Sequence, residues 1–151
     1  LIVALMFVGG CAGSTGGGIK IVRIFVAFKV ALREMSLFLR PNTVLRIKMG
    51  RKPMDRSAVS NIAGFVLLYI VLFLFIAMLM CAFTPDLATA VTASAATIGN
   101  IGPGLGGVGP MVNYSTIPPA GLSILIVSML LGRLELFTVL VLFLPRFWRK
   151  I

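Results

Sequence analysis

The sequence lacks the side chains on which most enzymes depend. It contains no histidine, two cysteines and four acidic residues among 151 positions. Without histidine, and with no pair of acids beside a nucleophile, acid–base and nucleophilic catalysis have few candidate residues. Cys11 and Cys81 both stand in apolar surroundings, so neither a disulfide framework nor a Cys/His metal site is supported. These absences disfavour a hydrolase or a transferase, and we expect no cofactor to be bound by this chain.

Charge is scarce as well. Charged residues make up 12% of the chain, whereas soluble domains carry about 25%. From residue 57 to residue 132 the only charged residue is Asp86. Such a stretch cannot cover a water-exposed surface, so a soluble enzyme is nearly excluded. With 59% hydrophobic residues and a mean hydropathy of +1.08, the chain is predicted to be a membrane protein.

The basic residues that are present lie in clusters. Eight of the fourteen fall between residues 29 and 56, and Arg146, Arg149 and Lys150 close the chain. Basic segments beside apolar runs are typical of cytoplasmic loops under the positive-inside rule. The net charge of +10 is therefore better explained by membrane topology than by nucleic-acid binding.

The first 39 residues predict one membrane crossing that is interrupted. Residues 1–8 are apolar but too few for a span, which needs about 20 residues. Six of the ten residues from 9 to 18 are glycine, which opposes a helix, and a helical pattern resumes over 19–39. A non-helical loop at membrane depth is tolerated only where protein buries it or where it lines an aqueous cavity. We therefore predict an intramembrane loop over 9–18.

The remaining residues predict a span, a re-entrant loop and a second span. A basic cytoplasmic loop over 40–56 precedes an uncharged span over 57–83, which Pro85 ends and after which Asp86 caps the next helix. Residues 87–97 form a pore helix too short to cross, followed by a glycine-rich stretch over 98–104. The second span covers 120–145, with Arg133 and Glu135 near its centre, and 146–151 form a cytoplasmic end. The fold class is thus an all-α membrane protein, a helix–re-entrant pore loop–helix repeat of the potassium-channel type.

Two groups of residues are candidates for function. Backbone carbonyls over 99–104 could bind a dehydrated cation, because glycine permits the required alternation of backbone handedness; a simple extracellular turn is the alternative. Arg133 would be costly at the bilayer centre unless it faced a cavity or a partner. We hypothesise that it contacts the 9–18 loop and helps to control passage, the alternative being that it holds two helices together.

Three motifs in order, over residues 9–20, 100–106 and 129–138, resemble the bacterial Trk/Ktr potassium-uptake membrane subunits, with the TrkH branch the nearer. That family has four helix–pore loop–helix repeats around one pore. The resemblance implies that residues 1–39 are the last helix of the third repeat and that 57–151 are the fourth, so that the chain is a C-terminal fragment of a longer polypeptide.

The resemblance also assigns roles to individual residues. It implies a filter that binds K⁺ through backbone carbonyls at Gly99, Asn100, Ile101 and Gly102, with the ion held at Asn100 and Ile101. It implies gating by Gly9, Gly10, Gly13, Ser14, Thr15, Gly16, Gly17, Gly18 and the pore-facing Arg133. K⁺ would then be the substrate rather than a cofactor.

The partners follow from the same resemblance. They are membrane lipid, the other repeats of the same polypeptide, a second copy in a homodimer, and a cytosolic nucleotide-binding regulatory ring (TrkA-like) that docks on residues 29–56. The resemblance also implies a location in the bacterial inner membrane, which the polypeptide would cross several times. The rival interpretation is a non-conducting assembly or scaffold subunit, in which glycines such as Gly9 and Gly13 serve only close helix packing.

Overall fold

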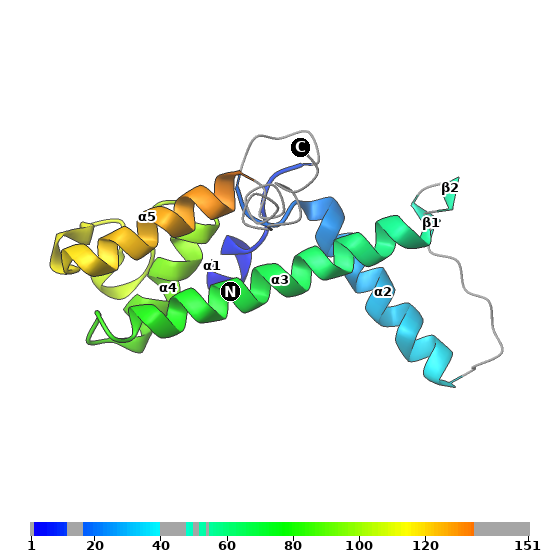
Figure 1. Ribbon diagram of the computed structural model, residues 1–151, viewed down its shortest axis with the longest axis horizontal. Helices are drawn as coiled ribbons and strands as arrows, with labels where there is room; N and C mark the ends of the chain where they lie inside the picture. Colours follow the sequence, from blue (N-terminus) through cyan, green and yellow to red (C-terminus); the bar gives the residue numbers. More distant parts are fainter. Residues whose placement is uncertain (1, 12–16, 40–47, 50–51, 54, 135–151) are drawn as a thin grey trace, which may run out of the picture.

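The computed structural model describes residues 2–11, 17–39, 48–49, 52–53 and 55–134 (Figure 1). Five α-helices and two short 3₁₀ turns account for most of this described part. The predicted all-α class is confirmed. In chain order the helical elements are α1 (Ile2–Met6), α2 (Ile21–Leu39), α3 (Arg56–Met80), α4 (Leu87–Ile98), η1 (Gly106–Val108), η2 (Tyr114–Thr116) and α5 (Pro119–Arg133).

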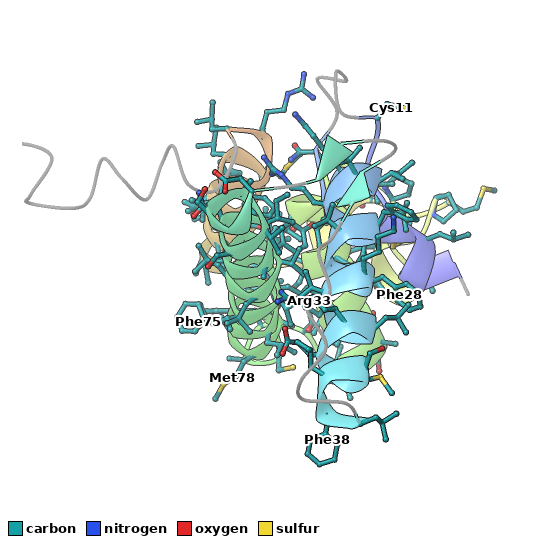
Figure 2. All side chains as sticks on the ribbon, turned by 90° about the vertical axis from the view of Figure 1, so that its right-hand side faces the viewer. Cys11, Phe28, Arg33, Phe38, Phe75 and Met78 are labelled. Atoms are coloured by element: carbon teal, nitrogen blue, oxygen red, sulfur yellow. The ribbon has the colours of Figure 1, made fainter. Side chains whose placement is uncertain are left out.

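Helix α3 is the longest element of the described residues, and it runs along the length of the molecule and crosses α2 (Figure 1). Its 25 residues span about 38 Å, which exceeds a hydrocarbon core of about 30 Å. In the described part of the chain it is the one helix long and apolar enough to cross a membrane. Its outer face carries exposed apolar side chains, among them Phe75 and Met78, which point away from the other helices (Figure 2). That face suits contact with lipid or with further helices.

Helix α4 lies between α3 and α5 and is almost entirely buried. Its alanines, with no exposed surface at Ala90, Ala93 and Ala96, let the two longer helices approach closely. Its hydroxyl groups bond within the helix: Ser94 Oγ donates to the Ala90 carbonyl (2.8 Å) and Thr97 Oγ1 to that of Ala93 (2.8 Å). These bonds satisfy polar groups that would otherwise be costly in an apolar interior.

The start of α4 corrects one expectation. Asp86 occupies the N-cap position, with extended backbone angles, but its carboxylate accepts no capping hydrogen bond. The side chain is exposed, and in this position solvent can satisfy the carboxylate instead. Asp86 therefore marks the boundary of the helix without stabilising it through its side chain.

The predicted interruption of the first crossing is present in the described residues. Helix α1 ends at Met6, and α2 begins at Ile21. The two ends of the intervening segment are held together: the Gly9 N–H donates to the Ile19 carbonyl (2.9 Å) and the Ile21 N–H to that of Gly10 (3.2 Å). Residues 12–16, which include the predicted gating residues Gly13, Ser14, Thr15 and Gly16, lie outside the described residues.

One other segment differs from the simplest expectation. The basic segment predicted as loop contains two antiparallel strands, β1 (Lys48–Met49) and β2 (Lys52–Pro53), with Lys48 opposite Pro53. Only two residues separate the strands, a spacing that suits a tight antiparallel pair, so a local hairpin forms without altering the helical class. Helix α5, from Pro119 to Arg133, covers the first part of the span predicted over 120–145. Residues 135–151 lie outside the described residues.

Candidate ion-binding site

The predicted filter begins as the C-terminal cap of α4. Gly99 still has helical backbone angles, whereas Asn100 has a φ of +52°. The Ile101 N–H donates to the Ala96 carbonyl (2.9 Å) and the Asn100 N–H to that of Thr97 (3.0 Å). This pair of bonds is the Schellman motif, in which the left-handed position is taken by glycine or, as here, by asparagine. The cap turns the backbone sharply where α4 ends.

The cap also determines where the carbonyl groups point. Because the N–H groups of residues 99–101 are bonded back to α4, their carbonyls are directed elsewhere. The Gly99 carbonyl faces the glycine-rich segment, since a Cβ on Gly17 would lie 2.9 Å from its oxygen. Within the described part of the chain, no hydrogen bond engages the carbonyl oxygens of Asn100 and Ile101. These two oxygens stand beside the electronegative C-terminus of α4, where a cation is favoured.

Glycine is required at position 102 by the backbone conformation and not by a lack of space. Its φ is +105°, which is unfavourable for any residue with a Cβ, yet a Cβ placed there would meet nothing within 4 Å. Its carbonyl oxygen accepts a hydrogen bond of 2.6 Å from the Tyr114 hydroxyl. Of the four predicted carbonyls, that of Gly102 is therefore engaged by a side chain from η2.

Threonine hydroxyls of α4 hold the stretch that follows the predicted filter. Thr92 Oγ1 accepts from the Leu105 N–H (3.1 Å), and Thr89 Oγ1 accepts from the Gly107 N–H (3.0 Å). Both threonines are buried. Neither they nor Tyr114 were singled out from the sequence, because nothing in a single hydroxyl indicates a partner 12 to 18 positions away.

The two glycine-rich segments meet each other directly. A Cβ on Gly17 would lie 2.8 Å from Asn100 Cβ, and one on Gly9 would lie 2.7 Å from the Gly17 carbonyl oxygen. Real Cβ atoms do not occupy such distances, so these glycines allow backbone to approach backbone. The structure thus brings Gly17 and Gly18 of the predicted gating loop to Gly99 and Asn100 of the predicted filter, whereas Gly9 and Gly10 bond to the backbone of Ile19 and Ile21.

Helix α5 closes the other side of the site. A Cβ on Gly132 would stand 2.0 Å from the Ile98 carbonyl oxygen, so α5 packs against the end of α4 at backbone distance. Thr97 Oγ1 and Ser128 Oγ are 3.3 Å apart in the buried contact between these helices. The Asn100 amide Nδ2 bonds to the Met129 carbonyl of the same helix (3.0 Å).

Arg133 is the last residue of α5 and its side chain is exposed. No hydrogen bond or ion pair joins it to the described residues of the 9–18 loop. Its hypothesised contact with residues 12–16, and its relation to Glu135, fall outside the described residues. Arg133 thus follows directly after the close contact of Gly132 with α4, and its role in controlling passage stays a hypothesis.

A short buried helix between two longer ones, ending in a turn that presents backbone carbonyls, defines a membrane protein of the pore-loop class. Comparison with known proteins is consistent with this class. The TrkH family, described as cation transport protein, matches residues 1–150. The chain belongs to the TrkH family of cation transport proteins. The predicted resemblance is confirmed, and these proteins are transporters and not enzymes.

Individual relatives agree with the family assignment. The Trk system potassium uptake protein TrkH of Escherichia coli K12 is 41% identical over 150 residues, covering 99% of this chain and 31% of the relative. The TrkI protein of Halomonas elongata is 35% identical over 97% of this chain and 30% of its own length. The crystal structure of the potassium transporter TrkH from Vibrio parahaemolyticus superposes with a TM-score of 0.86 at 37% identity, covering 97% of this chain and 31% of that one. The chain thus spans about a third of the length of these relatives.

Proposed function

We propose that the intact polypeptide containing these residues is the pore-forming subunit of a potassium uptake system of the bacterial inner membrane. The observation that carries this proposal is the pair of carbonyl oxygens at Asn100 and Ile101, beside the C-terminus of α4, which accept no hydrogen bond from the described residues. A K⁺ ion that sheds its water needs several such oxygens around one axis. The chain supplies one strand, and the other repeats of the polypeptide supply the rest.

The membrane potential can supply the free energy of this uptake, so the protein need not catalyse a chemical reaction. A membrane potential moves one charge with about 2.3 kcal/mol per 100 mV, which is enough to draw a cation inward through a filter that replaces its hydration shell. K⁺ is therefore the substrate in this proposal, and the protein contributes oxygen ligands and a barrier.

Gly102 favours the filter over the scaffold alternative. If the glycines served only close packing, each would have a neighbour where its Cβ would be. Gly9, Gly17 and Gly132 do have such neighbours, whereas a Cβ on Gly102 would meet nothing within 4 Å. Its positive φ instead supports a role in directing the backbone. Gly64 on α3 also meets nothing, but it has no positive φ, so the packing interpretation accounts for neither the empty space nor the backbone angle at Gly102.

The glycine-rich segment 9–18 is proposed as the gate on the cytoplasmic side of the filter. The close approach of Gly17 to Gly99 and Asn100 supports this, because a movement of the segment would alter the filter's surroundings directly. Arg133 is proposed to act with the part of the segment that includes Gly13, Ser14, Thr15 and Gly16.

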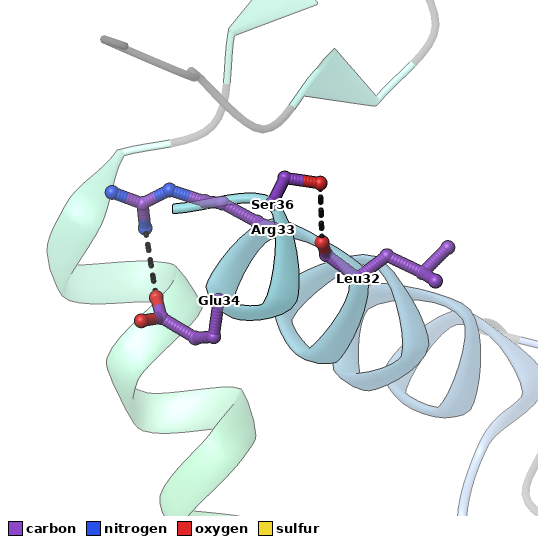
Figure 3. Close-up of polar contacts among 4 residues, drawn as sticks. All are labelled: Leu32, Arg33, Glu34 and Ser36. Carbon is purple, nitrogen blue, oxygen red and sulfur yellow. Dashed lines mark hydrogen bonds and ion pairs between the residues drawn. The ribbon is translucent and has the colours of Figure 1, made fainter. Parts of the chain in front are cut away.

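The basic segment 29–56 is proposed to dock a cytosolic nucleotide-binding ring, and the pore subunit to form a homodimer. The first part of this segment lies on α2, where Arg33 pairs with Glu34 at 3.8 Å and Ser36 Oγ donates to the Leu32 carbonyl at 2.8 Å (Figure 3). The excess of positive charge in the segment supports an acidic partner surface.

Rubidium uptake into liposomes that hold the intact polypeptide tests the proposal, with Gly102→Ser as the variant. Gly64→Ser is the matched control, because Gly64 lies on α3 with no atom within 4 Å of a Cβ and without a positive φ. We expect uptake by the parent and by Gly64→Ser, and altered ion preference in an assembled Gly102→Ser. Absence of uptake from an assembled parent, with and without a cytosolic ring, would favour the scaffold alternative.

A further inference from the structure

The peptide group between Gly102 and Pro103 has only one hydrogen-bonding atom. Proline has no backbone N–H, so the carbonyl oxygen of Gly102 is the sole polar atom of that group. Glycine at position 102 imposes little restriction on its own backbone. Something outside this peptide group must therefore fix the direction in which the carbonyl points.

Tyr114 provides that restraint. Its hydroxyl donates to the Gly102 carbonyl at 2.6 Å, across 12 positions of sequence and from a different element, η2. The ring is half-buried and packs against the hydrophobic core. The turn that carries it is itself fixed, because the Asn113 side chain accepts hydrogen bonds from the Ser115 N–H and hydroxyl.

We propose that Tyr114 is a positioning residue for ion selectivity, which holds the Gly102 carbonyl so that this oxygen does not turn toward the ion path. The proposal rests on the function proposed above. With the carbonyl held by Tyr114, the oxygens of Asn100 and Ile101 form the ligand set of this strand. Without the hydroxyl, the Gly102 carbonyl is free to rotate and to change the number of ligands that an ion meets.

The expected consequence is a change in preference among ions and not a loss of assembly. Selectivity depends on the number and arrangement of coordinating oxygens, so a mobile carbonyl weakens the discrimination between K⁺ and Na⁺. The loss of one hydrogen bond of this kind corresponds to a factor of about 3 to 10 in an equilibrium. We expect the ratio of rubidium to sodium uptake to fall by that factor.

The test is Tyr114→Phe in the intact polypeptide, with rubidium and sodium uptake measured in the same liposomes. The substitution removes one oxygen and keeps the ring, so the packing around it is retained. The chain supplies a matched control in its other tyrosine. Tyr69 lies in the core on α3, 1% exposed, and its hydroxyl has no hydrogen-bond partner among the described residues. Tyr69→Phe therefore removes a buried hydroxyl that bonds to none of the described residues.

The outcomes separate this proposal from the function on which it rests. A lower uptake ratio in Tyr114→Phe, with the parent ratio in Tyr69→Phe, supports the proposal. Uptake by the parent together with an unchanged ratio in Tyr114→Phe overturns it and leaves the pore function intact. Absence of uptake by the parent removes both.

A second measurement tests the proposal if the Tyr114→Phe protein assembles poorly. Thermal unfolding of detergent-solubilised protein in potassium and in sodium reports ion preference without flux. A smaller stabilisation by potassium relative to sodium supports the role of Tyr114. An equal loss of stability in both salts shows a purely structural role and overturns the proposal.

Discussion

The side-chain amide of Asn100 donates a hydrogen bond to the carbonyl oxygen of Met129, 3.0 Å away on α5. The same residue has a φ of +52° and its Cβ lies against Gly17. Asn100 therefore stands where the end of α4, the side of α5 and the glycine-rich segment come together. A residue in this place links the predicted filter to the predicted gate.

Substitutions at Asn100 separate its backbone role from its side-chain role. Asn100→Gly keeps the left-handed backbone and loses the bond to Met129, which lowers the free energy of unfolding by about 1 kcal/mol. Asn100→Ala loses the same bond and adds a left-handed strain of about 1–2 kcal/mol. Denaturant unfolding of the intact polypeptide in detergent measures both. Equal stability of the two variants would show that the positive φ is not maintained in the protein.

Gly132→Ala is expected to separate α5 from α4. Its Cβ would stand 2.0 Å from the Ile98 carbonyl oxygen, a backbone atom that cannot turn aside. Overpacking of this kind costs about 1–3 kcal/mol or more, and we expect reduced yield and a lower unfolding temperature. Gly64→Ala on α3 is the control, since its Cβ meets nothing within 4 Å. A Gly132→Ala protein as stable as the control would contradict this packing.

Gly17→Ala is expected to displace the glycine-rich segment from the filter. The new Cβ would lie 2.8 Å from Asn100 Cβ and 2.9 Å from the Gly99 carbonyl oxygen. If the segment closes the pore, its displacement raises rubidium uptake measured without a cytosolic ring. Gly107→Ala serves as the comparison, because its Cβ would meet only the Thr89 side chain, at 3.3 Å. Uptake unchanged in Gly17→Ala would argue that the segment is not the barrier.

Ion preference is expected to be insensitive to pH over the physiological range. Burial raises the pKa of the Tyr114 phenol above its ordinary value of 10.0, so the hydroxyl remains a donor until the solution is strongly alkaline. The raised pKa favours the protonated form in the folded protein. Any stability that this group contributes is therefore lost only as the pH rises through the raised pKa of the folded state. The ratio of rubidium to sodium uptake, measured between about pH 6 and pH 9, should stay constant. A titration within this interval would assign selectivity to another group.

The elements that depend on local patterns could be predicted from the sequence. Hydropathy and charge predicted an uncharged span over 57–83, and α3 extends from Arg56 to Met80. A short helix over 87–97 was expected from its length between Pro85 and the glycine-rich stretch, and α4 covers Leu87–Ile98. The interruption by the glycine-rich segment follows from the poor helix propensity of glycine.

The contacts that complete the site could not be predicted in this way. The bond from Tyr114 to Gly102 and those between the threonines of α4 and residues 105–107 join distant positions, and their geometry depends on how η1 packs on α4 and η2 on η1. The sequence indicated that glycine would permit an alternating backbone, but Asn100 has one of the positive φ angles. Asparagine tolerates the left-handed backbone region at the end of a helix. An argument based on the glycine positions alone does not include this possibility.

The most direct test of the central claim is to locate the ion itself. Crystals of the intact polypeptide grown in rubidium would give anomalous scattering at each bound ion. The account predicts a peak on the pore axis in direct contact with the carbonyl oxygens of Asn100 and Ile101, with the Gly102 carbonyl still bonded to Tyr114. A filter region without a peak, or a peak held by other atoms of this segment, would contradict the assignment.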